Sequence, residues 1–264
     1  RDEIGELSLA LREMTNELWK RMDTIERFAA DVSHEIKNPL TSLRSAVETA
    51  AIVKEPEKRD KLMQIVMHDV QRLDRLISDI SSASRLDAEL SREELKIVDL
   101  RAILHQLLDA FREPLERANE GKTPEHVDYR EHNIRLEIPG EDPVFVRGNP
   151  TRLAQVFRNL INNALSFSPR EGVVSVVVEN NKKTVAVHIK DEGPGIPENK
   201  LDSIFDRFYT ERPEHEAYGG HSGLGLSIAR QIVENHGGEI FATNIMDEYG
   251  AVKGARFTVI LNGV

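Results

Sequence analysis

The sequence contains no cysteine, no long apolar run and no excess of positive charge. Without cysteine, disulfide bonds, zinc–thiolate sites and thiol catalysis are excluded. No apolar stretch approaches the roughly 20 residues that a membrane-spanning helix needs. The net charge of -10 argues against a nucleic-acid-binding protein, which usually carries a basic face. A bound anion must therefore be held locally, by backbone N–H groups, by single basic residues or by a metal ion.

The length of the chain suits two ordinary domains, since it has 264 residues and 39% of them are hydrophobic. The first residue is Arg1, so the chain starts with neither an initiator methionine nor a signal peptide. We therefore expect it to be a piece of a longer protein.

The first third of the chain is predicted to be a helical hairpin. Apolar residues recur at a three-then-four spacing over residues 7–47, which predicts a long helix packed against partners. The pattern breaks at residues 54–57, and a second apolar seam covers residues 62–83. A single hairpin cannot bury both stripes well, so we expect a homodimer whose two hairpins form a four-helix bundle. The apolar seam consists of Leu7, Leu11, Met14, Leu18, Met22, Ile25, Ala29, Val32, Ile36, Leu40, Leu43, Val47, Leu62, Ile65, Val66, Val70, Leu73, Ile77, Ile80 and Ala83.

The first predicted helix contains the motif His-Glu-Ile-Lys-Asn-Pro-Leu at residues 34–40. At about 100° per residue, His34 and Asn38 point away from the apolar seam and toward solvent. Pro39 removes a backbone N–H and should kink the helix just after the histidine. In isolation, such a match would favour an incidental histidine on a polar face. Because the proline costs stability without an evident packing reason, and because nucleotide-type loops follow, we favour a phosphate-accepting His34.

After about residue 90 the pattern changes to mixed strands and helices. This mixture predicts an α/β two-layer sandwich with a mixed sheet, in which residues 173–190 form a β-hairpin. The expected strands are 133–138, 144–146, 173–179, 184–190, 239–243 and 255–261, and the expected helices are 99–118, 150–166 and 224–236.

Two polar segments in this half could bind a nucleotide. Gln155, Asn159 and Asn163 recur every four residues, which places their amides on one helical face, where they could meet a hydrated Mg²⁺ and phosphate oxygens. Asp191 ends a predicted strand and could accept a hydrogen bond from an amine such as adenine N6. Gly193 and Gly195, which follow it, would let the backbone approach a ligand. The alternatives are a solvated helix face and a plain strand-to-helix turn.

Two further segments complete the pattern. Residues 204–209, with Arg212 nearby, read as a mobile lid that carries aromatic anchors and basic residues, the alternative being a surface loop. Residues 219–226 are glycine-rich and open a helix, so their N–H groups could cradle a triphosphate. This loop is neither a Walker A motif nor a Rossmann fingerprint.

The order of these segments, together with the His34 helix, resembles the sensor histidine kinases of bacterial two-component systems over nearly the whole chain. Within that family the sequence is similar to the alphaproteobacterial envelope sensors of the ChvG/ExoS type. The segments that resemble the family's H, N, G1, F and G2 boxes are 34–40, 159–164, 191–197, 204–209 and 222–226.

The resemblance implies an α+β fold in three parts. Residues 20–90 would form the dimerisation and histidine-phosphotransfer (DHp/HisKA) hairpin, and residues 91–264 the ATP-binding domain with the Bergerat fold of GHKL ATPases. Residues 1–19 look like the end of a HAMP signal-relay domain. The chain would then be the cytoplasmic portion of an inner-membrane protein, which reaches the membrane only through segments outside it.

The resemblance also implies the chemistry. His34 would attack the γ-phosphate of ATP, Glu35 would act as the general base, and the phosphoryl group would pass to the receiver domain of a response regulator. Asn38 would align a water that dephosphorylates that regulator. Asn159 would hold Mg²⁺, and Asn163 would approach the phosphates.

Asp191 would recognise adenine, with Gly193 and Gly195 shaping its pocket. The other residues that the resemblance assigns to nucleotide binding are Phe205, Arg207, Phe208, Arg212, Gly223, Leu224 and Gly225, of which Gly223 and Gly225 would form the lid hinge. No nucleic-acid partner is expected.

One departure from the family leaves alternatives open. Many relatives carry a lysine and a tyrosine after the N box, where this chain has Ser166 and Phe167. A phosphate-binding cation is therefore missing, and Arg207 or Arg212 could compensate. The first alternative is a catalytically weak or silent scaffold that binds nucleotide and a receiver domain, or a signalling module biased toward its phosphatase state. An ATPase clamp of the Hsp90 or MutL type is the second, but it leaves the His34 hairpin unexplained.

Overall fold

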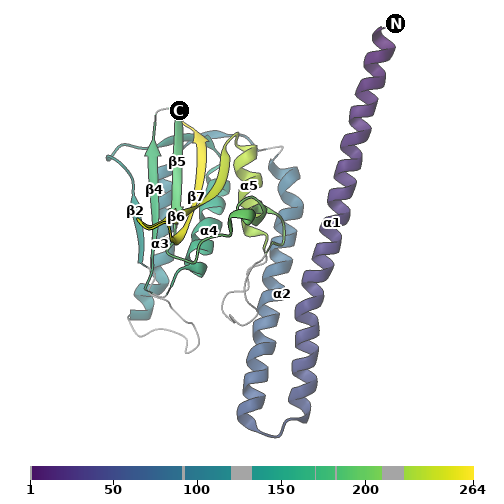
Figure 1. Cartoon of the computed structure of the whole chain (residues 1–264), viewed down its shortest axis with the longest axis vertical. Helices are drawn as coiled ribbons and strands as arrows, with labels where there is room; N and C mark the ends of the chain where they lie inside the picture. The colour runs from purple at the N-terminus through teal and green to yellow at the C-terminus, as the bar shows by residue number, and fades with distance from the viewer. Residues whose placement is uncertain (1, 91–92, 120–132, 170, 182, 210–222) are drawn as a thin grey trace. The chain divides into compact units, whose positions relative to one another are not determined.

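The computed structural model describes residues 2–90, 93–119, 133–169, 171–181, 183–209 and 223–264. The chain divides into two compact units, the first ending at Ser81 and the second beginning at Ser82 (Figure 1). The first unit is helical and the second mixes helices with strands, which confirms the predicted α+β fold class. None of the described helices combines the length and apolarity that spanning a membrane would require.

Helix α1 (Asp2–Ile52) and helix α2 (Pro56–Leu90) form the predicted hairpin (Figure 1). Proline is favoured in the first turn of a helix, where its missing N–H would have no partner anyway, so Pro56 suits the start of α2. Pro39 does not end α1, which continues for more than three turns to Ile52. Its ring is buried, so the proline has the packing role that the sequence left unexplained.

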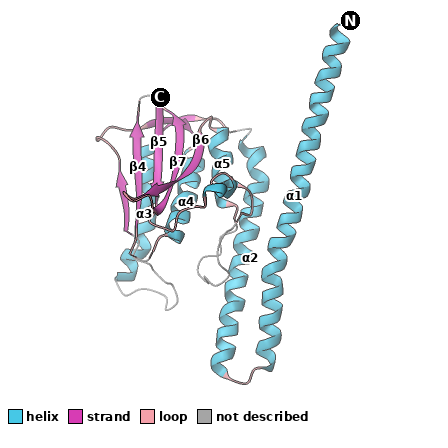
Figure 2. Ribbon diagram, in the orientation of Figure 1, coloured by secondary structure: helices cyan, strands magenta, loops and turns pink. Residues whose placement is uncertain are grey.

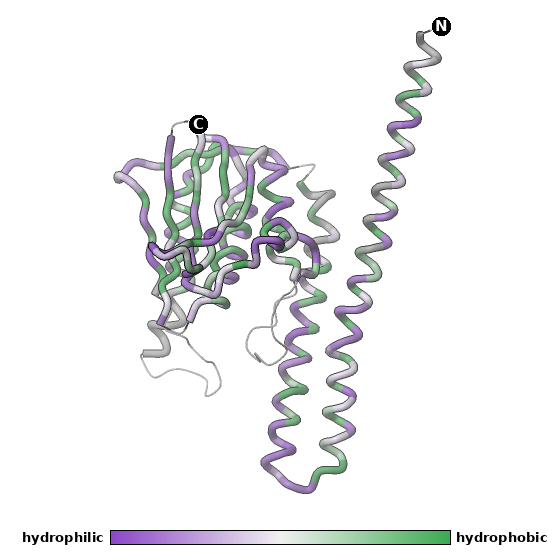
Figure 3. The backbone as a smooth tube through the Cα atoms, viewed as in Figure 1, coloured by the Kyte–Doolittle hydropathy of each residue, from purple (hydrophilic) through white to green (hydrophobic). Residues whose placement is uncertain are grey.

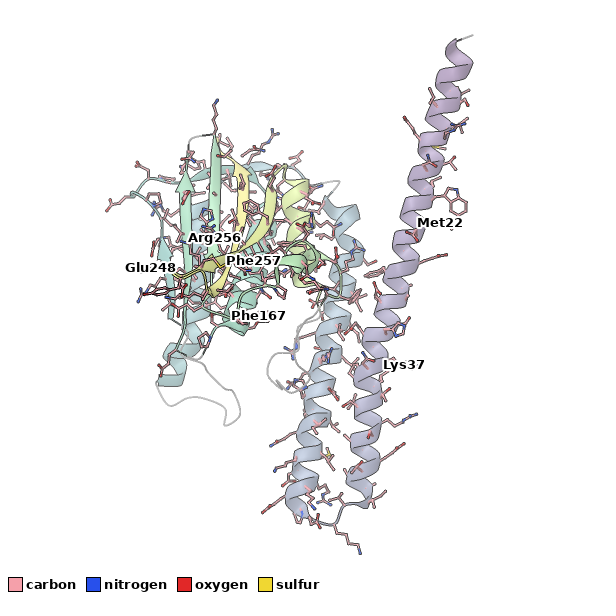
Figure 4. The ribbon with its side chains drawn as sticks, viewed as in Figure 1. Met22, Lys37, Phe167, Glu248, Arg256 and Phe257 are labelled. Atoms are coloured by element: carbon pink, nitrogen blue, oxygen red, sulfur yellow. The ribbon has the colours of Figure 1, made fainter. Side chains whose placement is uncertain are left out.

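The apolar seam is exposed along much of the hairpin. Met22 is 51% exposed, Ile25 65% and Ile77 59%, and the Met22 side chain stands out from α1 (Figure 4). Green apolar positions recur between purple polar ones along both helices (Figure 3). One copy of the hairpin therefore leaves in water the residues that a helical partner would bury.

The second unit is built on a five-stranded sheet of order β2-β4-β5-β7-β6. Strand β2 is parallel to β4, and the other neighbouring strands are antiparallel, so the sheet is mixed as predicted. A separate antiparallel ribbon pairs β1 with β3. The strands are β1 Lys96–Asp99, β2 Asn133–Glu137, β3 Phe145–Gly148, β4 Val173–Asn180, β5 Thr184–Lys190, β6 Glu239–Met246 and β7 Val252–Asn262.

Three helices cover one face of this sheet: α3 (Leu100–Asn119), α4 (Pro150–Phe167) and α5 (Gly225–Asn235) (Figure 2). Alternate valines of β4 and β5 point into the core beneath them, because successive side chains of a strand face opposite sides. Phe157, Leu160 and Ile161 of α4 are fully buried in that core. The core thus fixes α4, which carries the predicted amide row.

The structure contains all six predicted strands and all three predicted helices of this unit, with ends that differ by a few residues. The sequence missed β1, which has only four residues and alternates poorly in burial. Its conformation is set by pairing with β3, since Ile97 lies opposite Arg147 and Val98 opposite Val146. Such a short strand depends on its neighbour rather than on its own pattern.

Candidate nucleotide and phospho-acceptor sites

Asp191 lies just after β5, and the residue is only 4% exposed. One carboxylate oxygen, Oδ1, accepts hydrogen bonds from the Gly193 N–H at 2.9 Å and the Ala255 N–H at 3.0 Å. Burial raises the pKa of Asp191, and these two backbone donors partly oppose that rise. No described residue donates to Oδ2, so this oxygen can accept a hydrogen bond from a ligand.

The turn that follows Asp191 is held by a residue about 50 positions away. Asn244 of β6 brackets Ile196: its Oδ1 accepts from the Ile196 N–H at 2.8 Å, and its Nδ2 donates to the Ile196 carbonyl at 2.6 Å. Gly195 has φ +77°, and a Cβ there would overlap Cγ1 of Val252. This turn therefore requires glycine, for its backbone angle and for the space it occupies.

Two other close approaches bring the same turn against its surroundings. A Cβ on Gly254 of β7 would overlap the carbonyl oxygen of Asp191, and a Cβ on Gly193 would lie 2.8 Å from the carbonyl oxygen of Phe167. Phe167 ends α4 (Figure 4). The Asp191 turn, the end of α4 and the start of β7 thus converge on one place in the second unit.

Helix α4 presents the predicted amide row. Asn149 caps its first turn by accepting from the N–H groups of Thr151 and Arg152, and Pro150 occupies the first helical position, which proline tolerates well. Asn159 Nδ2 donates to the Gly225 carbonyl at 2.9 Å, which ties the row to the start of α5.

The other amide atoms of Asn159 and Asn163 can still donate or accept hydrogen bonds. No hydrogen bond from a described residue reaches Asn159 Oδ1, and the Asn163 side chain makes none with the described residues. Gln155 differs, because its Oε1 accepts from Arg152 at 3.3 Å. Amide oxygens such as that of Asn159 are suitable ligands for Mg²⁺.

Ser166 brings no charge to this region. Its hydroxyl donates to the Asn163 carbonyl at 2.8 Å, within the last turn of α4. Arg207 is half-buried, whereas Arg212 lies outside the described residues, so its predicted compensating role has no structural description. The described part of the chain holds no cluster of three His, Cys, Asp or Glu side chains fit for a metal ion.

The segments on either side of residues 210–222 are joined by a backbone hydrogen bond. The Phe208 N–H donates to the Gly223 carbonyl at 3.0 Å. Gly223 has φ +69°, and a Cβ there would lie 2.8 Å from Cα of Phe208. Phe208 itself has φ 61°, a conformation that costs a bulky side chain free energy. Phe208 and Gly223 are thus closely packed, and the hinge role of Gly223 and Gly225 stays a prediction.

Two residues predicted to contact nucleotide are buried. Phe205 is 4% exposed, its ring meets that of Phe257 edge-on at 6.4 Å, and the Arg230 guanidinium lies 5.6 Å from its centre. Leu224 is fully buried at the start of α5. Both side chains thus belong to the core, and their contact with nucleotide stays a prediction.

The phospho-acceptor motif lies in the first unit. His34 and Asn38 are exposed on α1, one helical turn apart, and Glu35 beside them is half-buried. Arg72 of α2 donates from Nη2 to Glu35 Oε2 at 3.3 Å. This contact was not predictable from the sequence, because a heptad pattern identifies apolar partners and not polar pairs between helices.

Comparison with known families matches both units. The family described as "Histidine kinase-, DNA gyrase B-, and HSP90-like ATPase" matches residues 148–263, and the "His Kinase A (phospho-acceptor) domain" matches residues 24–89. Sensor protein ChvG of Agrobacterium fabrum is 49% identical over 261 residues, which cover 98% of this chain and 43% of that protein. Sensor protein kinase WalK of Staphylococcus aureus is 30% identical over 222 residues, covering 83% of this chain and 50% of that sequence.

Solved structures agree with this match. Histidine kinase ThkA, in complex with response regulator protein TrrA, aligns with a TM-score of 0.67 and 26% identity, over 93% of this chain and 64% of that chain. Histidine kinase AdeS of Acinetobacter baumannii aligns with a TM-score of 0.60 at 22% identity and so supports the fold alone.

The chain therefore belongs to the sensor histidine kinases, with a HisKA phospho-acceptor domain and a histidine kinase-type ATPase domain. Within that family it is ChvG-like, as the sequence motifs predicted. It spans less than half the length of its ChvG relatives.

Proposed function

We propose that this chain is the kinase core of a sensor protein that phosphorylates itself on His34 with ATP and passes the phosphoryl group to an aspartate of a response regulator. The observation that carries the proposal is the combination of two sites in one polypeptide. An exposed His34 stands beside the carboxylate of Glu35, and Asp191 keeps one carboxylate oxygen without a described donor.

The second unit would bind the nucleotide. Oδ2 of Asp191 would accept a hydrogen bond from the adenine amino group, and the turn at Gly193 and Gly195 would shape the base pocket. Oδ1 of Asn159 would hold Mg²⁺, and Asn163 would donate to phosphate oxygens. Mg²⁺ would neutralise the charge that develops on the phosphates. Positioning of the reactants and such charge neutralisation supply most of the catalysis of phosphoryl transfer.

The first unit would carry out the transfer. The imidazole of His34 attacks the γ-phosphorus, so an N–P bond forms while the P–O bond to ADP breaks. Glu35 takes the proton from the other ring nitrogen, which keeps the lone pair of the attacking nitrogen available. Asn38 would later orient the water that removes the phosphoryl group from the regulator, since its amide can both donate and accept.

The partners follow from the same roles. Two copies would join through the apolar seam, and a receiver domain would dock at the His34 hairpin, a pairing for which ThkA with TrrA is a precedent in a related fold. We infer domain limits of 1–19, 20–90 and 91–264 for the HAMP end, the hairpin and the ATP-binding domain. The core would work on the cytoplasmic side of the inner membrane, anchored through other segments.

The test is to incubate the chain with Mg²⁺ and γ-labelled ATP and to examine the chemical stability of the label. We expect an acid-labile, alkali-stable label that disappears in His34→Ala, while ATP binding persists in that variant. Asn38→Ala should form phosphohistidine normally but remove phosphate from the regulator slowly. A label that survives in His34→Ala would contradict the assignment.

One observation favours a second candidate, a nucleotide-binding scaffold. Ser166 occupies the position of the usual lysine, and its hydroxyl is engaged within α4. Absence of any label despite measurable ATP binding would support the scaffold. Ser166→Lys would then be expected to restore labelling, whereas an active wild type would make the lysine dispensable.

A further inference from the structure

A small polar cluster lies between the two helices of the hairpin, next to the phospho-acceptor. Arg72 reaches from α2 to Glu35 on α1, and their side chains are 31% and 19% exposed. Both are thus largely withdrawn from water, so their attraction is screened less than that of a surface pair. Asp69 lies three residues before Arg72 on α2 and is only 7% exposed.

Two atoms of this cluster are buried without a hydrogen-bond partner among the described residues. They are Nε of Arg72 and Oδ2 of Asp69, a donor and an acceptor. Side chains three apart on a helix are neighbours, so a small side-chain adjustment could join them. The other oxygen of Asp69, Oδ1, lies 3.7 Å from Nδ1 of His68, and the described ion pair of Arg72 is the one with Glu35.

Pro39 adds to the dependence of Glu35 on Arg72. A proline has no N–H, so the helical hydrogen bond that would run from residue 39 to the Glu35 carbonyl is missing. The backbone at Glu35 is therefore held less firmly than elsewhere in α1. Its carboxylate has a single described hydrogen bond, the one from Arg72, and Oε1 receives none from the described residues.

We propose that Arg72 is a positioning residue for phosphohistidine formation, an inference that rests on the proposed function. By holding Oε2 of Glu35, the guanidinium leaves Oε1 to accept the proton from the His34 imidazole. When Glu35 takes that proton it becomes neutral. Asp69, three residues before Arg72 on α2, is then a second carboxylate toward which the guanidinium could turn.

The test compares Arg72→Met with Arg72→Lys and with Arg75→Met. Arg75 lies on the same helix but donates to its own helix, to the Gln71 carbonyl at 3.2 Å, so its variant is the matched control. Initial rates of phosphohistidine formation are measured over a range of Mg²⁺–ATP concentrations. We expect Arg72→Met to lower kcat by about 10- to 100-fold, the usual worth of a hydrogen bond to a charged group. KM for ATP should not change, Arg72→Lys should recover part of the rate, and Arg75→Met should match the wild type.

A double-mutant cycle separates positioning from general damage to the hairpin. In a Glu35→Gln background, long incubations measure the residual rate, and adding Arg72→Met should reduce it no further. The proposal is overturned if Arg72→Met retains the wild-type kcat, if Lys is no better than Met, or if the loss is equal in both backgrounds. Loss of the dimer or of the melting transition in Arg72→Met would likewise assign the residue a structural role. An unlabelled wild type would instead refute the proposed function itself.

Discussion

At the scale of single residues, the two oxygens of one carboxylate have separate tasks. Oδ1 of Asp191 is occupied by two backbone N–H groups that come from its own turn and from β7. Those bonds fix the plane of the carboxylate, so Oδ2 is presented in one direction. The side chain is preorganised, and a ligand that binds there does not have to order it.

Asp191→Asn should separate the structural bonds from ligand recognition. An asparagine can keep its oxygen toward the N–H groups of Gly193 and Ala255. Its NH₂ group, a donor, would then face the adenine amino group, which is also a donor, so no hydrogen bond could form between them. We expect affinity for a non-hydrolysable ATP analogue to fall by about 10- to 100-fold, since a hydrogen bond to a charged group is lost. Calorimetric titration measures this.

The control for that experiment is Glu192→Gln, which changes a neighbouring exposed carboxylate by the same chemistry. Its affinity should equal that of the wild type, and both variants should melt as single cooperative transitions. An Asp191→Asn protein that binds the analogue normally would remove Asp191 from the base pocket.

At the scale of elements, the turn after β5 is determined by strands that come much later in the chain. Gly195 and Gly250 both have positive φ, +77° and +80°, but only Gly195 is crowded. A Cβ on Gly250 meets nothing within 4 Å, whereas one on Gly195 would overlap Val252. The pair therefore isolates the effect of packing from that of backbone conformation.

Gly250→Ala should cost about 1–2 kcal/mol of unfolding free energy, the price of the left-handed conformation alone. Gly195→Ala should cost roughly 1–3 kcal/mol more, because the added methyl group must displace its neighbours. It should also weaken nucleotide binding, while Gly250→Ala should not. Urea titrations of both proteins give the comparison, and equal losses would show that the turn after Asp191 is not tightly packed.

His236 connects two elements and makes the second unit sensitive to acid. Its Nδ1 lies 2.8 Å from the Ile232 carbonyl in α5, and its Nε2 accepts from the Asn149 N–H, the cap of α4, at 3.1 Å. This arrangement needs the neutral ring with the proton on Nδ1. Burial lowers the pKa of His236, and the bond to Ile232, with Glu93 nearby, opposes that lowering while Arg152 adds to it.

The sign of the pH effect follows from that direction. The unfolded chain takes up a proton near the ordinary pKa of 6.5, before the folded chain does. Stability is thus complete above pH 6.5 and falls as the pH drops below it, by at most about 1.4 kcal/mol per pH unit for one proton. Unfolding free energies measured from pH 8 to 5.5 should show this slope, and His236→Gln should reduce it. An unchanged slope in the variant would show that another group causes the pH dependence. His188, whose pKa is also lowered chiefly by burial, would be the next residue to replace.

The same elements show what the sequence can and cannot predict. Strands β4 and β5 were predictable because every second residue of their buried face is a valine or isoleucine, and the motif around Asp191 was recognisable because its residues are contiguous. Asn244 and Arg72 were not predictable, because each acts on a segment far away in the chain through side-chain geometry alone. Phe205 shows that a motif residue can also serve the core, because its ring packs against that of Phe257.

At the scale of the whole molecule, the exposed apolar seam predicts how two copies associate. Ile77 is 59% exposed in one copy, so a charge there should leave a single hairpin little affected. In a four-helix bundle the same charge would be buried, at a cost of several kcal/mol. Ile77→Glu should therefore raise the dimer dissociation constant by at least about 100-fold.

Sedimentation at several protein concentrations measures that constant. Ser78→Glu, which adds the same charge at the next, exposed position of α2, is the control and should dimerise normally. If Ile77→Glu remains as dimeric as the control, the two copies join through another surface.

The position of β7 within the sheet has a consequence for biosynthesis. This strand lies between β5 and β6, although it is the last of the described strands in sequence order. Until residues 252–262 have left the ribosome, β5 keeps an open edge and Asp191 lacks its bond from Ala255. An incomplete sheet with an unpaired edge is a template for aggregation. Premature termination shortly before Ala255 would thus release a chain that contains nearly every motif but lacks the bond from Ala255 to Asp191. Its unpaired strand edge would be prone to aggregation, which makes such a chain a substrate for chaperones and proteases.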